Sequence, residues 1–201
     1  MSFRDFRLPD VLKKFDLRTS ERPGLFEDRP PASPSQALLD TLRYNVPLAT
    51  AMGTEKARSE LIIAPVLVEL KRSFRPDIAL FSGVELSVDP EAGLTGACDF
   101  LITSSPEQLF VKAPIVALAE AKNENLRDGM GQCAAEMVAA KIFNERDGTP
   151  VETLYGVVTT GTAWKFLSLT GKTLGIDLNE YSISQPDKIL GILVSMVTPR
   201  V

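Results

Sequence analysis

The segment 114–122 constrains the fold of this chain more than any other stretch. It opens with a proline, continues as an apolar run, and ends with Glu120 and Lys122 on either side of one alanine. A short apolar run opened by proline predicts a buried strand. Because side chains alternate along a strand, we expect Glu120 and Lys122 on one face with Val116 and Leu118. Charges at the end of a buried strand need partners, since unpaired buried charge is costly.

A helix is expected to cover this strand. Ala117, Ala119 and Ala121 lie on its second face and are small enough to let a helix approach closely. After a polar connection at 123–131 that contains two glycines, residues 132–145 predict a helix that is apolar around much of its surface. The apolar members are Cys133, Ala134, Met137, Val138, Ala140, Ile142 and Phe143. Such a helix is typically buried against a sheet.

Another long helix is expected at 54–74, with Thr54 as its N-cap. Pro65 should kink this helix or restart it, because proline lacks the backbone N–H. At regular helical spacing one face carries Glu60, Ile63, Ala64 and Leu67. Glu60 therefore points where an apolar stripe points. The alternative is a solvated carboxylate at the end of the stripe.

The remaining pattern predicts a mixed sheet. Strands are expected at 80–88, 96–103, 114–122, 154–160, 163–169 and near 181–183, with a turn at 89–93 and a hairpin at Gly161. A closing helix is expected at 186–197. Helices before and between the strands give the order helix, three strands, helix, two strands, which predicts an α/β core with helices on the faces of a mixed sheet.

Length and composition favour one domain over residues 1–201, since 44% of the residues are hydrophobic and can bury a core. Within this domain, residues 1–45 are predicted to form an N-terminal arm. A short helix begins near Pro9, 19–35 is irregular and a second short helix spans about 36–44. Residues 54–169 form the predicted core, and 180–201 form the C-terminal strand and helix.

Composition also excludes several kinds of site. The chain has no histidine, which excludes histidine-based acid–base catalysis and His-ligated zinc. Two cysteines are too few for a zinc cluster and fit a reducing cytoplasm. Residues 1–20 lack the apolar core of a secretion signal, and no apolar run approaches the ~18 residues of a membrane span. We therefore expect a cytoplasmic protein without a membrane partner.

Three charged residues occur in a distinctive order. Asp99 lies near the start of the predicted strand 96–103, in Gly-Ala-Cys-Asp-Phe-Leu-Ile, and Glu120-Ala-Lys122 ends the next strand. With Glu60 in the preceding helix, this pattern resembles the PD-(D/E)XK nuclease superfamily, which has the restriction-endonuclease-like fold. The resemblance covers about 54–169 and implies the common α-β-β-β-α-β core of that fold over these residues. More loosely, the whole chain resembles stand-alone bacterial members without an assigned activity.

The resemblance implies a metal-dependent nuclease. Asp99 and Glu120 would bind Mg²⁺ or Mn²⁺, which prefer carboxylates and water. Lys122 would orient the attacking water, and Glu60 would be an accessory or second metal ligand. The literal Pro76-Asp77 pair precedes the first predicted strand, so the acidic role is assigned to Asp99.

Gln132 is similar to the glutamine of RecB-like members, which have Gln-x-x-x-Tyr after the catalytic strand. Here the fourth following residue is Glu136, where those members have tyrosine. The alternative for Gln132 is an ordinary polar residue at a helix start. Both interpretations stay open on the sequence.

Nucleic acid, with DNA favoured, is the expected partner, and its phosphates would need local positive charge because the formal net charge is −4. The candidates are Lys56, Arg58, Lys71, Arg72, Arg75 and Arg127. A solvated helix surface is the alternative. Trp164 and Lys165 could stack on a base, although a core position for Trp164 is favoured. Cys98 is expected to be a core thiol.

Two functions therefore remain. The first is divalent-metal-dependent hydrolysis of phosphodiesters through Asp99, Glu120 and Lys122. The second is a non-catalytic domain that binds nucleic acid or a protein. A salt-bridge cluster without a metal is the structural alternative for the three charged residues. Small nucleases of this fold often pair to cut two strands, so a homodimer is also expected.

Overall fold

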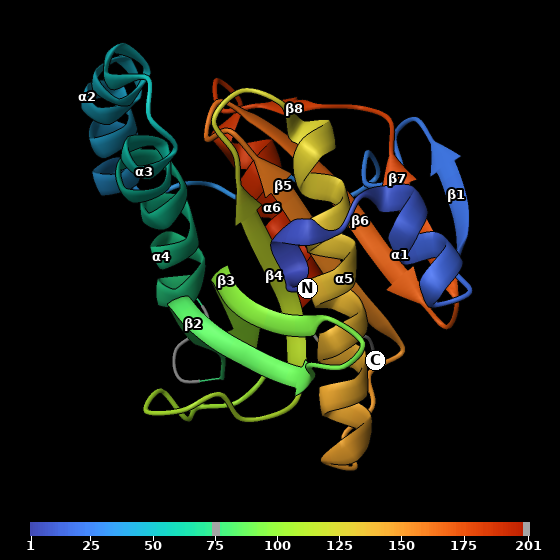
Figure 1. The fold of residues 1–201 in the computed structure, drawn as a ribbon. Coiled ribbons are helices and arrows are strands. Elements are labelled where there is room, and N and C mark those ends of the chain that lie inside the picture. Colours follow the sequence, from blue (N-terminus) through green and yellow to red (C-terminus); the bar gives the residue numbers. More distant parts are fainter. Residues whose placement is uncertain (74–76, 199–201) are drawn as a thin grey trace.

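The computed structural model describes residues 1–73 and 77–198, which form a mixed sheet with helices on both faces (Figure 1). The sheet order is β1-β7-β6-β5-β4-β3-β2, with β8 paired to β6. The strands are β1 (Arg18–Arg22), β2 (Ala79–Asp89), β3 (Leu94–Thr103), β4 (Ile115–Ala121), β5 (Thr153–Thr159), β6 (Ala163–Thr170), β7 (Thr173–Asp177) and β8 (Tyr181–Ser182). The predicted α/β class with a mixed sheet is confirmed.

Strand direction changes at the centre of the sheet. β2, β3 and β4 form an antiparallel meander. β4 and β5 are parallel, because helix α5 (Leu126–Arg146) carries the chain back between them. β5, β6 and β7 are again antiparallel, and β1 joins the edge in parallel with β7. The predicted order of helix, three strands, helix and strand is thus present.

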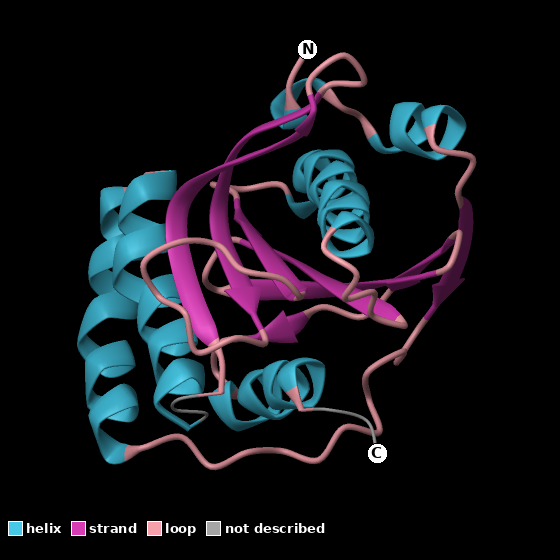
Figure 2. Ribbon diagram, turned by 90° about the horizontal axis from the view of Figure 1, so that it is seen from below, coloured by secondary structure: helices cyan, strands magenta, loops and turns pink. Residues whose placement is uncertain are grey.

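The sheet curves around α5 on one side, as Figure 2 shows. The 3₁₀ turn η1 (Phe3–Asp5) and helix α1 (Leu8–Lys14) contact α5 on the same side. The other face is covered by α2 (Gln36–Met52), α4 (Ala64–Ser73) and α6 (Pro186–Val197). Each face has its own apolar core.

The predicted long helix is divided into three parts. Helix α3 (Glu55–Arg58) begins after Thr54, whose side chain accepts a hydrogen bond from Ala57 N–H as predicted. A π-helical segment, η2 (Ser59–Ile63), follows, and α4 restarts beside Pro65. Pro65 cannot donate to the carbonyl of Leu61, and Asn45 Nδ2 donates to that carbonyl instead, at 2.8 Å.

Several element boundaries differ from expectation. The segment predicted as an irregular arm contains β1, and the predicted short helix at 36–44 continues to Met52. Strand β7 was not predicted. Helix α5 begins at Leu126 rather than at Gln132, so Gly129 and Gly131 lie inside a helix. Glycine is required at position 131 because residues 6–8 pass very close to the helix. A Cβ on Gly131 would lie 2.4 Å from the carbonyl oxygen of Phe6.

The predicted alternation of side chains between the two faces of β4 is correct only towards the C-terminal end of the strand. A β-bulge at Val116 shifts the pairing, because Ile102 lies opposite Ala117 while Thr103 lies opposite Ile115. Val116 therefore packs with the core under α6, whereas Leu118 packs with the core around α5. The expectation that Val116 and Leu118 share a face is wrong.

In the described part of the chain, no helix is long and apolar enough to cross a membrane. Three sequence-based expectations fall on residues outside the described ranges. They concern Phe74 at the end of the predicted helix, Arg75 in the basic group, and Pro76 before Asp77.

Candidate active site

The charged end of β4 meets the end of β5 and the first turns of α5. Lys122 follows β4 directly, and its backbone N–H donates to the carbonyl of Thr159 at 2.8 Å, so parallel pairing holds this end in place. Lys122 Nζ lies 2.5 Å from Glu120 Oε1. The side chain of Glu120 is only 2% exposed, and a buried carboxylate at the carboxyl end of parallel strands lies where α/β sheets commonly bind ligands.

Asp99 joins this group from β3. Phe100 lies opposite Ala119, which brings the neighbouring Asp99 to the end of β4. There Asp99 Oδ2 accepts a hydrogen bond from Ala121 N–H at 2.9 Å. Asp99 is half-buried, so its carboxylate lies at the border between the sheet and solvent. Its position is therefore fixed by the backbone of the strand that carries Glu120.

The two carboxylates act on each other. Burial, and after it the negative charge of Asp99, raise the pKa of Glu120 from 4.5 to about 7, although Lys122 opposes both. Glu120 Oε2 is buried and has no hydrogen-bond partner within the described residues. A buried carboxylate oxygen without a partner is rare in proteins, and a cation would relieve both its desolvation and the repulsion from Asp99.

Lys122 continues the polar chain into α5. Its Nζ also donates to Gln132 Oε1 at 3.3 Å, and Gln132 Nε2 donates to Glu136 Oε1 at 3.1 Å. Burial lowers the pKa of Lys122, but the adjacent Glu120 carboxylate outweighs it, so the pKa is raised overall. The Lys122 ammonium is thus held positive between an anion and an amide oxygen.

Glu136 is the most deeply buried of the hydrogen-bonded side chains Glu120, Lys122, Gln132 and Glu136. Its side chain is 0% exposed, and Oε2 has no partner within the described residues. Burial raises its pKa well above the usual range, and the charge of Glu120 raises it further. No role was predicted for Glu136, which was noted only because it stands where RecB-like members have tyrosine. A signal was present, because the carboxylate lies in a helix that is otherwise apolar on most sides.

Glu60 does not lie where the sequence predicted. Its side chain is 60% exposed and pairs with Lys56 Nζ at 2.7 Å. Ile63 and Leu67 of the predicted stripe are buried, but Glu60 is not, so the alternative of a solvated carboxylate at the end of the stripe is confirmed. The π-helical turn of η2 shifts the helical register there, and Ile62 is buried beside Ile63. The helical carboxylate whose charge acts on Glu120 and Lys122 is Glu55, an exposed residue at the start of α3.

The expected basic residues divide into two groups. Lys56, Lys71 and Arg72 have intramolecular partners: Glu60, the carbonyl of Ile78, and Glu69 at 3.7 Å. Arg58 and Arg127 lie beside the candidate site. Arg58 Nη1 donates to the carbonyl of Thr160, one residue beyond the strand end that holds Lys122, and Arg127 is exposed on the first turn of α5.

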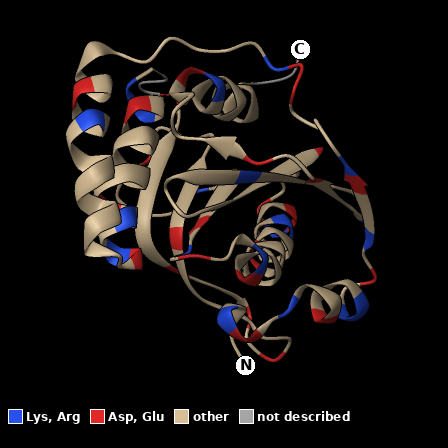
Figure 3. Cartoon of the chain, turned by 90° about the horizontal axis from the view of Figure 1, so that it is seen from above, with Lys and Arg blue, Asp and Glu red and all other residues tan. Residues whose placement is uncertain are grey.

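Figure 3 looks onto this edge of the molecule, where basic and acidic residues are interspersed. Phosphate contacts here would therefore depend on individual residues rather than on a broad basic field.

Trp164 and Cys98 belong to the core. Trp164 is 0% exposed, and its Nε1 donates to the carbonyl of Gly161 at 2.9 Å, so the base-stacking alternative is wrong. Lys165 is buried, and its Nζ donates to the carbonyls of Asp177, Leu178 and Asn179. Cys98 is fully buried, which confirms the expected core thiol.

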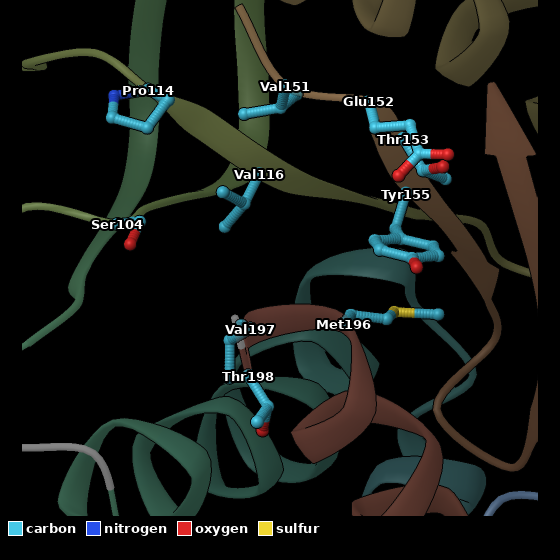
Figure 4. A pocket seen from close by; sticks show the side chains of 10 residues that line it. All are labelled: Ser104, Pro114, Val116, Val151, Glu152, Thr153, Tyr155, Met196, Val197 and Thr198. Atoms are coloured by element: carbon cyan, nitrogen blue, oxygen red, sulfur yellow. The ribbon is translucent and has the colours of Figure 1, made fainter. Parts of the chain in front are cut away.

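A separate cavity lies at the opposite end of β4 (Figure 4). It measures about 280 Å³ and is lined mainly by apolar side chains, among them Pro114, Val116 and Met196. Because Pro114 precedes β4 and Lys122 follows it, this cavity and the charged group lie at opposite ends of one strand. The candidate active site is the charged end.

The residues at this end fit a divalent cation with few protein ligands. Within residues 1–73 and 77–198, no group of three or more His, Cys, Asp or Glu side chains is placed to hold a metal ion. Mg²⁺, however, is usually bound by one or two carboxylates, with water and substrate phosphate completing its shell. Asp99 and Glu120, whose Oε2 has no partner in the described part of the chain, are the two carboxylates that could supply such ligands. The expected third ligand, Glu60, is paired with Lys56 instead.

Comparison with known proteins adds no further assignment. No family model matches the chain, and no curated protein matches its sequence significantly.

Proposed function

We propose that this protein hydrolyses phosphodiester bonds of nucleic acid, DNA above all, in a divalent-metal-dependent reaction at Asp99, Glu120 and Lys122. The observation that carries the proposal is the buried, unpartnered Glu120 Oε2, on a carboxylate whose Oε1 pairs with the Lys122 ammonium and whose pKa the charge of Asp99 raises. The order α4-β2-β3-β4-α5-β5 agrees with the α-β-β-β-α-β core that the resemblance implies. We therefore also propose a restriction-endonuclease-like core.

Each residue has a distinct role in this proposal. Asp99 and Glu120 would hold Mg²⁺ or Mn²⁺, which when bound polarises a phosphate and lowers the pKa of a coordinated water. Lys122 orients the attacking water and offsets the negative charge that grows on the phosphate in the transition state. Arg58, whose Nη1 donates to the Thr160 carbonyl, and Arg127, which is exposed on the first turn of α5, would contact flanking phosphates.

Cleavage of a substrate panel tests this function. Wild-type protein with Mg²⁺ or Mn²⁺ is incubated with plasmid, linear duplex, single-stranded DNA and RNA. The variants are Asp99→Asn, Glu120→Gln and Lys122→Met, and Glu85→Gln, an exposed carboxylate on β2, is the matched control. We expect each site variant to lose at least about 100-fold in rate, since removing one transition-state contact has effects of that order.

Circular dichroism and thermal unfolding establish that the variants are folded. Cleavage that persists at the control rate in all three site variants would reject the proposal. Binding of nucleic acid by the wild type without cleavage of any substrate would support the non-catalytic alternative instead.

A further inference from the structure

Gln132 lies between a cation and a carboxyl group. Its amide has one accepting end and one donating end, and the two are used differently: Oε1 accepts from Lys122 Nζ, and Nε2 donates to Glu136 Oε1. A rotation of the amide by half a turn would bring its N–H groups towards the Lys122 ammonium, which has no acceptor. Some group must therefore fix which way the amide faces.

Glu136 is placed to do this. It lies four residues after Gln132, on the same face of α5, and accepts from the Gln132 amide in the interior. Burying a carboxyl group that has one oxygen without a partner is unfavourable for folding. Of the neighbours on α5, Cys133 and Met137 pack in the apolar core. The chain thus keeps a costly polar group in a place where an apolar side chain would fit.

We propose that Glu136 is a positioning residue for the catalytic Lys122, acting through Gln132; this inference rests on the proposed function. By accepting from Gln132 Nε2, Glu136 turns Gln132 Oε1 towards Lys122 Nζ. That contact, together with Glu120 Oε1, gives the ammonium two fixed partners from different elements, β4 and α5. The Glu120–Lys122–Gln132–Glu136 chain therefore restricts where Lys122 can place its charge.

The close passage of Lys122 along α5 agrees with this role. A Cβ on Gly129 would lie 3.0 Å from Lys122 Cγ and 3.1 Å from its Cε. The aliphatic part of Lys122 is therefore packed against the first turns of α5, and only its end remains to be oriented. Gln132 supplies that contact one helical turn further along the same helix.

Two substitutions separate positioning from packing. Glu136→Met keeps the approximate volume and removes the acceptor, and Glu136→Gln keeps an accepting oxygen. Met137→Leu, a buried neighbour on α5 outside the polar chain, is the matched control. Crystal structures give the separation of Lys122 Nζ from Gln132 Oε1, and steady-state cleavage gives kcat and KM separately.

We expect Glu136→Met to lose the contact between Lys122 Nζ and Gln132 Oε1 and to lower kcat about 10- to 100-fold with KM unchanged, the size seen when groups supporting a ligand are removed. Glu136→Gln should keep the contact and stay within about threefold of wild type. An unchanged contact in Glu136→Met, or a kcat equal to that of Met137→Leu, would overturn the proposal. If the wild type cleaves no substrate, the proposed function fails. The contact between Lys122 Nζ and Gln132 Oε1 in the crystal structures still tests the positioning role on its own.

Discussion

Asp99 Oδ2 accepts a hydrogen bond from the backbone N–H of Ala121 at 2.9 Å, next to Glu120 in the chain. This bond joins the middle of β3 to the end of β4, where the ladder of residue pairs between the two strands stops. The two carboxylates are therefore brought together by the sheet itself, and their repulsion is built into the folded state. The predictions below depend on this arrangement.

Removal of the Asp99 charge should lower the pKa of Glu120. In Asp99→Asn the side-chain oxygen can still accept from Ala121 N–H, while the negative charge that raises the pKa of Glu120 is absent. We expect the pKa of Glu120 to fall below the value of about 7 in the wild type, as followed by NMR titration of its carboxyl carbon. Glu85→Gln, on the exposed surface of β2, should leave it unchanged. An unaltered Glu120 pKa in Asp99→Asn would show that the two carboxylates do not interact.

The stability of the protein should depend on pH through Glu120. Its folded-state pKa is raised from 4.5 to about 7, so the folded state holds this proton more tightly than the unfolded state. The contribution of Glu120 to stability is therefore fully present below about pH 4.5 and is lost as pH rises to about 7. The loss amounts to roughly 3 kcal/mol at most.

Urea unfolding at a series of pH values measures this dependence. The free energy of unfolding of wild type minus that of Glu120→Gln should decrease between about pH 4.5 and about pH 7 and stay constant above it. A difference that rises with pH across this range would contradict the raised pKa.

Much of the fold follows from local sequence patterns. The strands β2 to β6, helix α6, the N-cap at Thr54 and the hairpin at Gly161 are all predicted, because alternation, caps and turn residues are local signals. β1 is missed because the five residues of this strand are all polar and its partner β7 lies far away in the sequence. The start of α5 is missed because Gly129 and Gly131 indicate a loop, and only the packed structure shows that these positions have no space for a side chain.

Part of the candidate site could also be predicted, because it depends on local strand and helix signals. The pattern predicts the strands and the helix that carry Asp99, Glu120, Lys122 and Gln132. In the structure Lys122 contacts Glu120 and Gln132, and Asp99 accepts from the backbone N–H of Ala121. Glu60 was misplaced because its predicted face assumed a regular helical register, which the π-helical turn interrupts. Glu136 was not singled out, although its place in a largely apolar helix indicated burial, because its role depends on the direction of one amide, which has no sequence signature.

Gly129→Ala should destabilise the protein, although alanine is normally the better helix residue by about 1 kcal/mol. The new Cβ would lie 2.6 Å from Val158 Cγ1 and 3.0 Å from Lys122 Cγ, so either β5 or the side chain of Lys122 must move. We expect a loss of about 1–3 kcal/mol in urea unfolding. Asp128→Ala, at the exposed neighbouring position, is the control. A gain in stability for Gly129→Ala would contradict the close packing of α5 on the end of β4.

Asp177→Asn should loosen the N-terminal segment. The buried carboxylate of Asp177 accepts from the backbone N–H groups of Gly24, Phe26 and Asn179 and from the hydroxyl of Tyr181. An amide has only one accepting oxygen, so at least one buried donor loses its partner, at a cost of about 1–3 kcal/mol. Hydrogen exchange at Gly24 and Phe26 should accelerate, and Tyr181→Phe should have a smaller effect. Unchanged protection at both amides would contradict this role.

Calorimetric titration with Mn²⁺ tests the central claim most directly, because it needs no knowledge of the substrate. If Asp99 and Glu120 form a cation site, the wild type should bind Mn²⁺ at neutral pH. Binding should be lost in Asp99→Asn and in Glu120→Gln but retained in the surface control Glu85→Gln. Equal Mn²⁺ binding by all four proteins, or none by the wild type, would contradict the account of this site as a metal-dependent active centre.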